Sequence, residues 1–365
     1  MRRRTSWLGV LGGFLLLAAP AAGQLAVAWN RTDGTAESGW LRSRAPWTLR
    51  AGSAITDRHA VLAAAGRRHL LVLSRDPGAL SVVDLRGWHV RHQLSVPKAE
   101  DVVASGPCTA WVTRRGSARL LRVDLCAGTA VEATDLSAFA DADGDPDLGA
   151  MAVDGHRLFV QVRRQNEKLV NRFAPPAYLA VVDTRSGALI DTDPVTPGVQ
   201  AITLAGTAPK HRMQIVASVR RLFVSATGGF FDAGGLEAID LDGLRSDGLV
   251  IRESDGRTGA DLGPFVMVTP ERGFVVYSTD FDLSSHLQPF TIERGVREGP
   301  ELHVSLGYAV PSLIVDPLTN TLFLADGVFG RRGVFAFDAT SGARLTTHPT
   351  AVDGMPTDLI LLRRP

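Results

Sequence analysis

The chain has 365 residues, with 39 Lys and Arg against 38 Asp and Glu, so its formal net charge is +1. This balance excludes the strong basic excess that is typical of a nucleic-acid-binding domain. The chain holds 37 glycines and 20 prolines and has almost no helical periodicity. Short apolar runs separated by these residues indicate an all-β chain with many turns.

The first 23 residues have the layout of a secretory signal peptide. Three arginines precede an apolar run of about a dozen residues, and small residues follow as far as Gly23. The run is shorter than the ~20 residues that span a bilayer, and no later segment is long enough. We therefore expect residues 1–23 to be removed, and residues 24–365 to form a secreted or periplasmic protein without a membrane span.

One strand pattern recurs along the chain, an apolar run that ends in a hydrophobic–Asp pair. Another apolar strand, such as "HLLVLS" or "RLFVSA", comes before each copy, and the last spacing is wide enough to hide a degenerate copy at "HLQPFTIERG". A period of roughly 40–60 residues with four short strands in each unit is typical of a β-propeller. The clear copies end at Asp84, Asp124, Asp183, Asp240 and Asp338.

The two ends of the chain supply the strands that the six visible units lack. After the sixth unit, "PTDLILLRR" has the composition of an innermost strand, and before the first unit lie "QLAVAWN", "GWLRSR" and "PWTLRAG". Pairing these segments would close the ring and remove open sheet edges. We therefore predict one all-β domain, a seven-bladed β-propeller with four-stranded antiparallel blades, closed by its N- and C-terminal strands.

The repeats resemble those of the YVTN-type seven-bladed propellers, a surface-layer family related to the lactonase-like propellers. The resemblance is carried by "LSVVDLRGWHVRHQLSVP", "YLAVVDTRSGALI", "VDPLTNTLFLAD" and "VFAFDATSGARL". It implies the same scaffold over the whole mature chain. It does not imply a ligand or a reaction, since members of one fold bind different molecules.

The repeated aspartates and the two cysteines have structural interpretations. An Asp that leads into an "xxSG" turn accepts hydrogen bonds from the amides of that turn, so five equivalent copies are not catalytic groups. Cys108 and Cys126 flank two strands that turn near Ser117. In a simple hairpin they face each other within disulfide reach, and an exported protein meets an oxidising compartment. We predict a Cys108–Cys126 disulfide in the second unit.

Common catalytic motifs are missing. The sequence has no C-x-x-C-H, H-E-x-x-H, G-x-S-x-G or P-loop pattern, and its nine histidines are scattered. The missing motifs favour a non-catalytic function but leave it uncertain whether the protein is an enzyme.

Long loops share one face of the predicted propeller, because second-to-third strand loops and blade-to-blade connections lie on the same side. Binding residues in rigid scaffolds concentrate in such loops. These loops carry phenylalanines and arginines, which suit an organic ligand or a partner protein. The alternative is that each phenylalanine folds beneath its own loop. The candidate residues are Arg172, Phe173, Phe230, Phe231, Asp232, Phe281, His286, Phe329 and Arg331.

An acidic stretch, "DADGDPD", joins the second and third units on this same face. Alternating carboxylates suit calcium, which takes six to eight oxygens. An EF-hand is excluded, because Pro146 and Ala152 stand where its glycine and glutamate belong. A looser calcium loop at Asp141, Asp143 and Asp145 and a solvated acidic turn both remain open.

Together these observations favour an exported, non-catalytic recognition module. We expect a monomer that binds a small molecule or another exported protein on its long-loop face. Two alternatives remain, a lactonase-like hydrolase with His286, Arg172, Arg331 and Asp232 at the funnel and a structural scaffold for protein–protein contacts.

Overall fold

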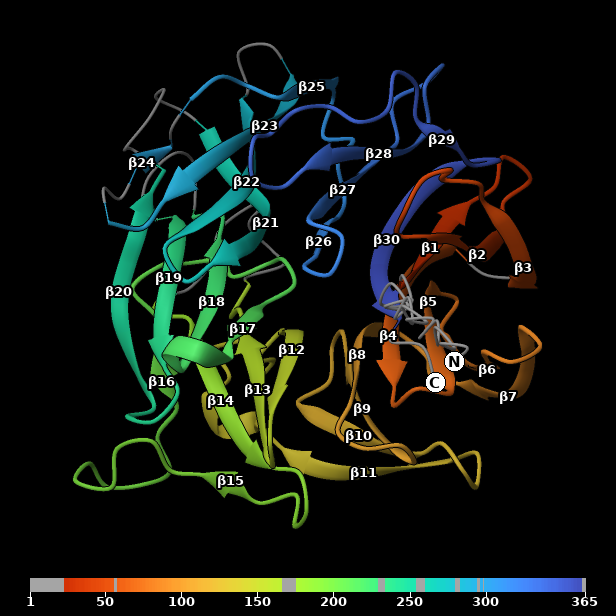
Figure 1. Ribbon diagram of the computed structural model, residues 1–365. Helices are drawn as coiled ribbons and strands as arrows, with labels where there is room; N and C mark the ends of the chain where they lie inside the picture. Colours follow the sequence, from red (N-terminus) through yellow and green to blue (C-terminus); the bar gives the residue numbers. More distant parts are fainter. Residues whose placement is uncertain are drawn as a thin grey trace, which may run out of the picture.

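The computed structural model describes residues 23–55, 58–165, 175–228, 234–253, 260–279, 283–293, 296–297 and 299–362. Within these residues the strands form seven antiparallel sheets around a common axis (Figure 1). The helical residues there are two single turns, η1 (Ser137–Phe139) and η2 (Ala217–Val219). None of the described helical segments is long and apolar enough to cross a bilayer.

Each sheet is one blade, and the blades are numbered in chain order. Within each blade the strands are given from the innermost strand outward. Blade 1 holds β30 (Met355–Leu362), β1 (Gln24–Asn30), β2 (Ala36–Arg42) and β3 (Arg50–Ile55). Blade 2 holds β4 (Arg58–Ala65), β5 (His69–Asp76), β6 (Ala79–Asp84) and β7 (His89–Ser95). Blade 3 holds β8 (Ala99–Ala104), β9 (Thr109–Arg114), β10 (Arg119–Asp124) and β11 (Thr129–Asp135).

The remaining blades follow the same plan. Blade 4 holds β12 (Leu148–Asp154), β13 (Arg157–Val162), β14 (Tyr178–Asp183), β15 (Leu189–Ile190) and β16 (Ile202–Thr203). Blade 5 holds β17 (Gln214–Val216), β18 (Arg221–Ala226), β19 (Gly235–Asp240) and β20 (Arg245–Arg252). Blade 6 holds β21 (Ala260–Thr269), β22 (Arg272–Thr279), β23 (Ser284–Thr291), β24 (Val296–Arg297) and β25 (His303–Leu306). Blade 7 holds β26 (Leu313–Asp316), β27 (Thr321–Asp326), β28 (Gly333–Asp338) and β29 (Thr350–Ala351).

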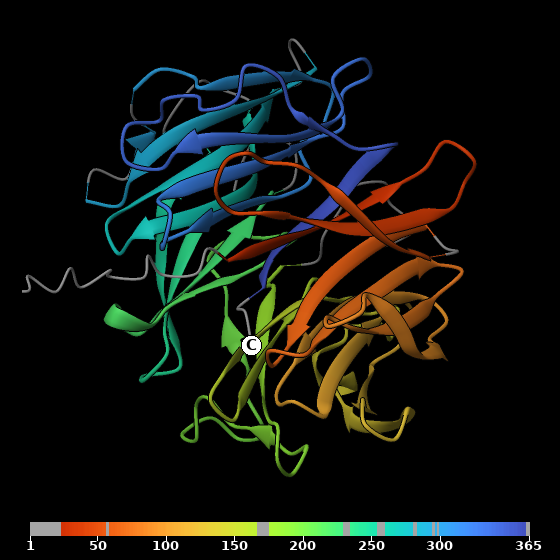
Figure 2. The ribbon, with the colours of Figure 1, turned by 45° about the vertical axis from the view of Figure 1, so that its right-hand side comes forward.

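The ring closes as the sequence predicts. Strand β30, from the end of the chain, pairs antiparallel with β1, and the register runs from Gln24 opposite Leu362 to Asn30 opposite Met355. Figure 2 shows β30 alongside the N-terminal strands of blade 1. The closure gives the first and last strands a hydrogen-bonding partner that neither would otherwise have.

The hydrophobic core lies between the blades. Seven clusters of buried side chains each join one blade to the next, including the cluster that joins blade 7 to blade 1. Second strands such as β5 and β27 therefore contact neighbouring blades on both faces and are almost entirely buried. Outer strands such as β11 are mostly exposed. This explains why the inner strands appear in the sequence as continuous apolar runs.

The repeated aspartates support turns, as predicted. Asp183 Oδ1 accepts hydrogen bonds from the backbone N–H groups of Arg185 and Ser186, at 2.8 and 2.9 Å. Asp338 Oδ1 likewise accepts from Thr340 and Ser341, at 3.1 and 2.7 Å. These backbone bonds lower the pKa of both carboxyls, because they stabilise the charged form.

The predicted disulfide is present. Cys108 and Cys126 are bonded across the β9–β10 hairpin, and their Cα atoms are 5.2 Å apart. Cys108 precedes β9 and Cys126 follows β10, so the bridge lies among the short turns, away from the long-loop face.

We predict that replacing both Cys108 and Cys126 with alanine lowers the free energy of unfolding by about 3 kcal/mol, because the bond closes a short loop in the unfolded chain. Denaturant unfolding of the variant and the wild type measures this. A reducing agent should bring the wild type to the midpoint of the variant. Equal midpoints for the oxidised wild type and the variant would contradict the prediction.

Candidate functional site

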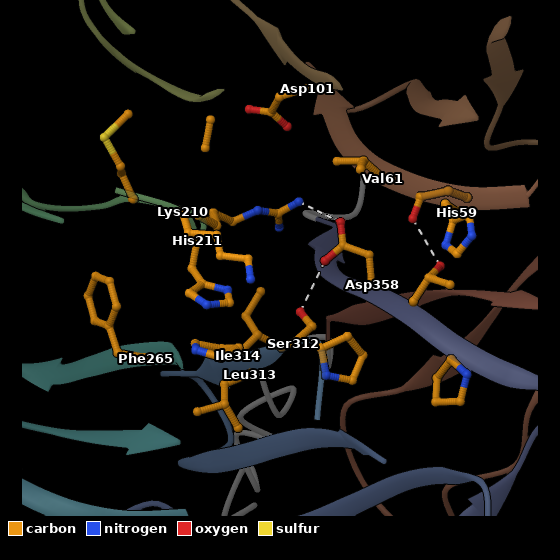
Figure 3. Close-up of a pocket in the computed structure, with 18 of the residues that line it drawn as sticks. His59, Val61, Asp101, Lys210, His211, Phe265, Ser312, Leu313, Ile314 and Asp358 are labelled. Atoms are coloured by element: carbon orange, nitrogen blue, oxygen red, sulfur yellow. Dashed lines mark hydrogen bonds and ion pairs between the residues drawn. The ribbon is translucent and has the colours of Figure 1, made fainter. Parts of the chain in front are cut away.

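A cavity of about 580 Å³ occupies the central channel at the end where the innermost strands begin (Figure 3). It is lined by the entry segments of these strands and by the ends of second strands, for example Asp101 at β8, Arg75 at β5 and Asp358 at β30. This is the end of the propeller that carries the long loops. Its volume is in the range of sites for small organic ligands.

Polar side chains in the channel bind the free edges of the innermost strands. Each of these strands is paired on one side only, and its other edge must find partners. Asp101 Oδ2 accepts from the Met151 N–H at 2.7 Å. Gln214 binds both backbone groups of Met267, accepting from its N–H at 2.6 Å and donating to its carbonyl at 3.1 Å. Both side chains thus attach their own blade to the next one.

The same arrangement closes the ring between blades 1 and 2. Asp358 Oδ2 accepts from the Leu62 N–H at 2.8 Å and from the Arg212 guanidinium at 2.7 Å. Its other oxygen accepts from Ser312 Oγ at 3.0 Å. Arg212 also donates to the carbonyls of Leu62 and Leu359, at 2.6 and 3.1 Å. Asp358 and Arg212 are therefore occupied by the fold.

A second ion-pair group surrounds Glu100 at the edge of the cavity. Arg163 Nη1 lies 3.2 Å from Glu100 Oε1, and Arg75 Nη2 lies 3.8 Å from the same oxygen. Arg75 also donates to the Glu100 carbonyl at 2.7 Å, and Arg163 donates to the carbonyls of Asp147 and Leu148. Both cations thus have a carboxylate and backbone acceptors.

The segment Lys210–Gln214 is different, because every one of its five residues lines the cavity. It leads into β17, the short innermost strand of blade 5. In the part of the chain that the structure describes, neither the Lys210 ammonium nor the His211 imidazole has a hydrogen-bonding or ionic partner. In Figure 3 both side chains lie at the cavity, on the same side as Phe265.

The charge state of His211 follows from its position. His211 is half-buried, and its ring borders the cavity. Burial lowers the pKa of His211 to about 3, and the nearby charges of Lys210 and Arg75 lower it further. The imidazole is therefore neutral at any physiological pH, with one nitrogen that donates and one that accepts.

The pKa of Asp101 is shifted in the opposite direction. It is only 8% exposed, and burial raises its pKa to about 6 although Arg212 and the Met151 N–H favour the charged form. The carboxyl therefore gains its negative charge near neutral pH.

Blades 6 and 7 contribute mainly apolar side chains to the cavity wall. Pro264, Phe265 and Val266 of β21 and Leu313 and Ile314 of β26 line it. Blades 6 and 7 thus form an apolar arc, and blades 1 to 5 supply the charged residues.

Three of the sequence-predicted rim residues, His286, Phe329 and Arg331, lie in the described part of the chain, and none of these three lines the cavity. Arg172, Phe173, Phe230, Phe231, Asp232 and Phe281 lie outside the described residues. Phe329 is 87% exposed, with the Arg332 guanidinium 5.2 Å from its ring centroid. Arg331 donates to the carbonyl of Val304 on blade 6, at 2.8 Å.

His286 is placed within blade 6 and not at the funnel. It is 4% exposed on β23, its Nδ1 lies 3.1 Å from Glu301 Oε2, and its Nε2 lies 2.6 Å from Ser284 Oγ. Its ring stacks on Tyr277, with centroids 4.9 Å apart. The structure therefore does not bring His286 and Arg331 together at the channel.

The acidic stretch forms a chain of local turns. Asp141 Oδ1 accepts from the Asp143 N–H at 3.1 Å, Asp143 from Asp145 at 2.9 Å, and Asp145 from Asp147 at 3.0 Å. Among the described residues, no three or more His, Cys, Asp or Glu side chains are gathered as metal ligands. A calcium loop and a solvated acidic turn therefore both remain open for Asp141, Asp143 and Asp145.

No pattern used to predict the binding face from the sequence pointed to the cavity residues of blade 5. The tripeptide Lys210-His211-Arg212 is a visible signal, since three basic residues stand together just before an apolar strand. The segment looks like a plain connector because β17 is only three residues long.

We predict that Asp101→Asn removes a pH dependence of stability. The folded-state pKa of about 6 exceeds the unfolded value, so stability from proton binding is fully present below pH 4 and is lost as the pH rises through 6. The loss is about 3 kcal/mol for a shift of two units. Unfolding of both proteins from pH 4 to 7.5 measures the difference. A difference in unfolding free energy between the two proteins that does not change with pH would contradict the raised pKa of Asp101.

For the acidic stretch, we expect that calcium and chelator leave the melting temperature unchanged, since the described carboxylates are engaged with backbone N–H groups. Thermal unfolding with millimolar calcium or EDTA tests this. A rise in melting temperature with calcium that is lost in Asp143→Asn would instead establish the calcium loop.

Comparisons with known proteins identify the fold. No protein-family model and no curated protein sequence matches the chain. Among solved structures, the periplasmic gluconolactonase PpgL of Pseudomonas aeruginosa is similar with a TM-score of 0.65 and 15% identity, over 94% of this chain and 99% of that one. A putative 6-phosphogluconolactonase from Bacteroides fragilis has a TM-score of 0.63 and 12% identity, over 94% and 99%. Apo AztD from Citrobacter koseri has a TM-score of 0.55 and 13% identity, over 93% and 98%. At such identities these likenesses show that the chain is a seven-bladed β-propeller with lactonase-like structural neighbours.

Proposed function

We propose that this chain is an exported β-propeller that captures a small organic molecule in its central cavity and does not transform it. The observation that carries the proposal is the 580 Å³ cavity, which has charged residues from blades 1 to 5 and apolar residues from blades 6 and 7. Such a mixed lining suits a ligand with one polar end and one apolar part.

Export is supported by two independent features. The N-terminal segment has the layout of a signal peptide, and the cysteines of blade 3 are joined in a disulfide, which persists in oxidising compartments. We propose a secreted or periplasmic monomer of the YVTN type, on the strength of its repeat sequences.

Among the described residues that line the cavity, neither histidine is hydrogen-bonded to a carboxylate, which favours binding over general acid–base catalysis there. A general base works best with a pKa near the operating pH, and the pKa of His211 is about 3. Among the described carboxylates that line the cavity, Glu100 and Asp358 are ion-paired, and Asp101, although its pKa is about 6, is bound to the Met151 N–H of the next blade. Lactone hydrolysis is the second candidate, because two of the similar structures carry lactonase names.

The predicted long-loop residues belong to this proposal as the outer border of the site. Phe329 is a large apolar side chain left in solvent near the same end of the propeller. A substitution of Phe329 therefore distinguishes binding on the rim from binding in the cavity.

We predict that native mass spectrometry of the protein purified from its own source finds a bound small molecule. In Ala150→Trp the new indole fills cavity space, so this molecule should be lost, whereas Phe329→Ala should retain it. Circular dichroism of both variants confirms that they are folded.

Retention in Ala150→Trp together with loss in Phe329→Ala would move the site to the rim. Hydrolysis of gluconolactone by the wild type, abolished in Ala150→Trp, would replace the proposal with the lactonase alternative.

A further inference from the structure

The cations that line the cavity differ in whether the protein neutralises them. Arg163 and Arg75 face Glu100, and Arg212 faces Asp358 at 2.7 Å. Lys210 is the exception among the described lining cations, since no carboxylate of the described residues lies within ion-pair distance of its ammonium. Within the described residues, the cavity wall therefore presents a positive charge at Lys210 that no carboxylate neutralises.

Beside this charge lies a neutral hydrogen-bonding group. His211 follows Lys210 in the chain, and burial keeps its imidazole uncharged. A Cβ atom built on Gly263 of β21 would lie 3.8 Å from His211 Nε2. The imidazole thus reaches the strand that begins the apolar arc, which continues with Pro264 and Phe265.

Polar and apolar groups are therefore adjacent in the cavity. In the view of Figure 3, Lys210 and His211 lie between Asp101 on one side and Phe265, Leu313 and Ile314 on the other. A ligand that places an acidic group at Lys210 would extend its body along the side chains of Phe265 and Leu313.

We infer that the cavity selects a small organic monocarboxylate with an apolar body, whose carboxylate binds the Lys210 ammonium and the His211 imidazole. The inference rests on the proposed binding function and names the class of ligand. The bond from Lys210 is charge-assisted and stronger than one between neutral groups. The apolar body gains by leaving water.

Specificity against uncharged analogues follows from the same contact. A neutral ligand that covers Lys210 would remove water from the ammonium without supplying a negative charge, which is unfavourable. A hydrogen bond to a charged group contributes about 1.5–3 kcal/mol, which corresponds to roughly a tenfold to hundredfold change in Kd.

Isothermal titration calorimetry with phenylacetate and its uncharged isostere phenylacetamide tests the inference. We expect phenylacetate to bind the wild type at least about tenfold more tightly than the amide. Lys210→Met keeps the length of the side chain and removes its charge, so it should weaken phenylacetate binding by a similar factor and leave binding of the amide unchanged.

Lys98→Met is the matched control, because Lys98 does not line the cavity. It should bind phenylacetate as the wild type does. Equal affinity for acid and amide, an unaffected Lys210→Met, or no binding of phenylacetate by the wild type would each overturn the monocarboxylate inference. Capture itself would stand in those cases if native mass spectrometry still finds a molecule that Ala150→Trp excludes.

Discussion

The free edges of the innermost strands are the constraint on which the rest of this structure depends. A propeller pairs each of these strands on one side only and turns the other edge toward the channel. Buried backbone groups must find partners, and here side chains of Asp101, Gln214 and Asp358 supply them from one blade to the next. The channel is therefore polar because the backbone of the fold requires it.

This requirement distinguishes cavity side chains that are bound to the backbone of the fold from side chains that are available to a ligand. A carboxylate or guanidinium in the channel suggests catalysis when it is viewed alone. Asp358 and Arg212, however, together bind Ser312 and the backbone groups of Leu62 and Leu359. Once such groups are set aside, the described lining leaves the side chains of Lys210, His211 and His59, and the first two lie next to an apolar arc. The proposed function and the proposed ligand class both follow from the position of Lys210 and His211 beside that arc.

The sequence predicts the scaffold well because the scaffold is repetitive. Five copies of the strand that ends in aspartate reveal the period, and the unpartnered segments at both ends reveal the closure of blade 1. The hairpin midpoint at Ser117 is sufficient to pair Cys108 with Cys126. Each of these features depends on neighbours in the chain or on a repeat, and both are visible in one sequence.

The cavity was not predicted because its residues come from all seven blades and share no spacing. Asp101 and Asp358 meet around one channel although they are far apart in the chain, and no local pattern distinguishes them from other strand residues. The rim interpretation relied on loop length and aromatic content. Loop length indicates the correct end of the propeller, but it cannot show that the described Phe329 points into solvent or that His286 is buried within its blade.

The most direct test of the account is the location of a ligand in a crystal structure. Crystals soaked with 4-bromophenylacetate would show the bromine by its anomalous scattering. We expect a bromine peak beside Phe265 and Leu313, with the carboxylate at Lys210. A bromine peak confined to the outer loops, or a carboxylate directed away from Lys210, would contradict it.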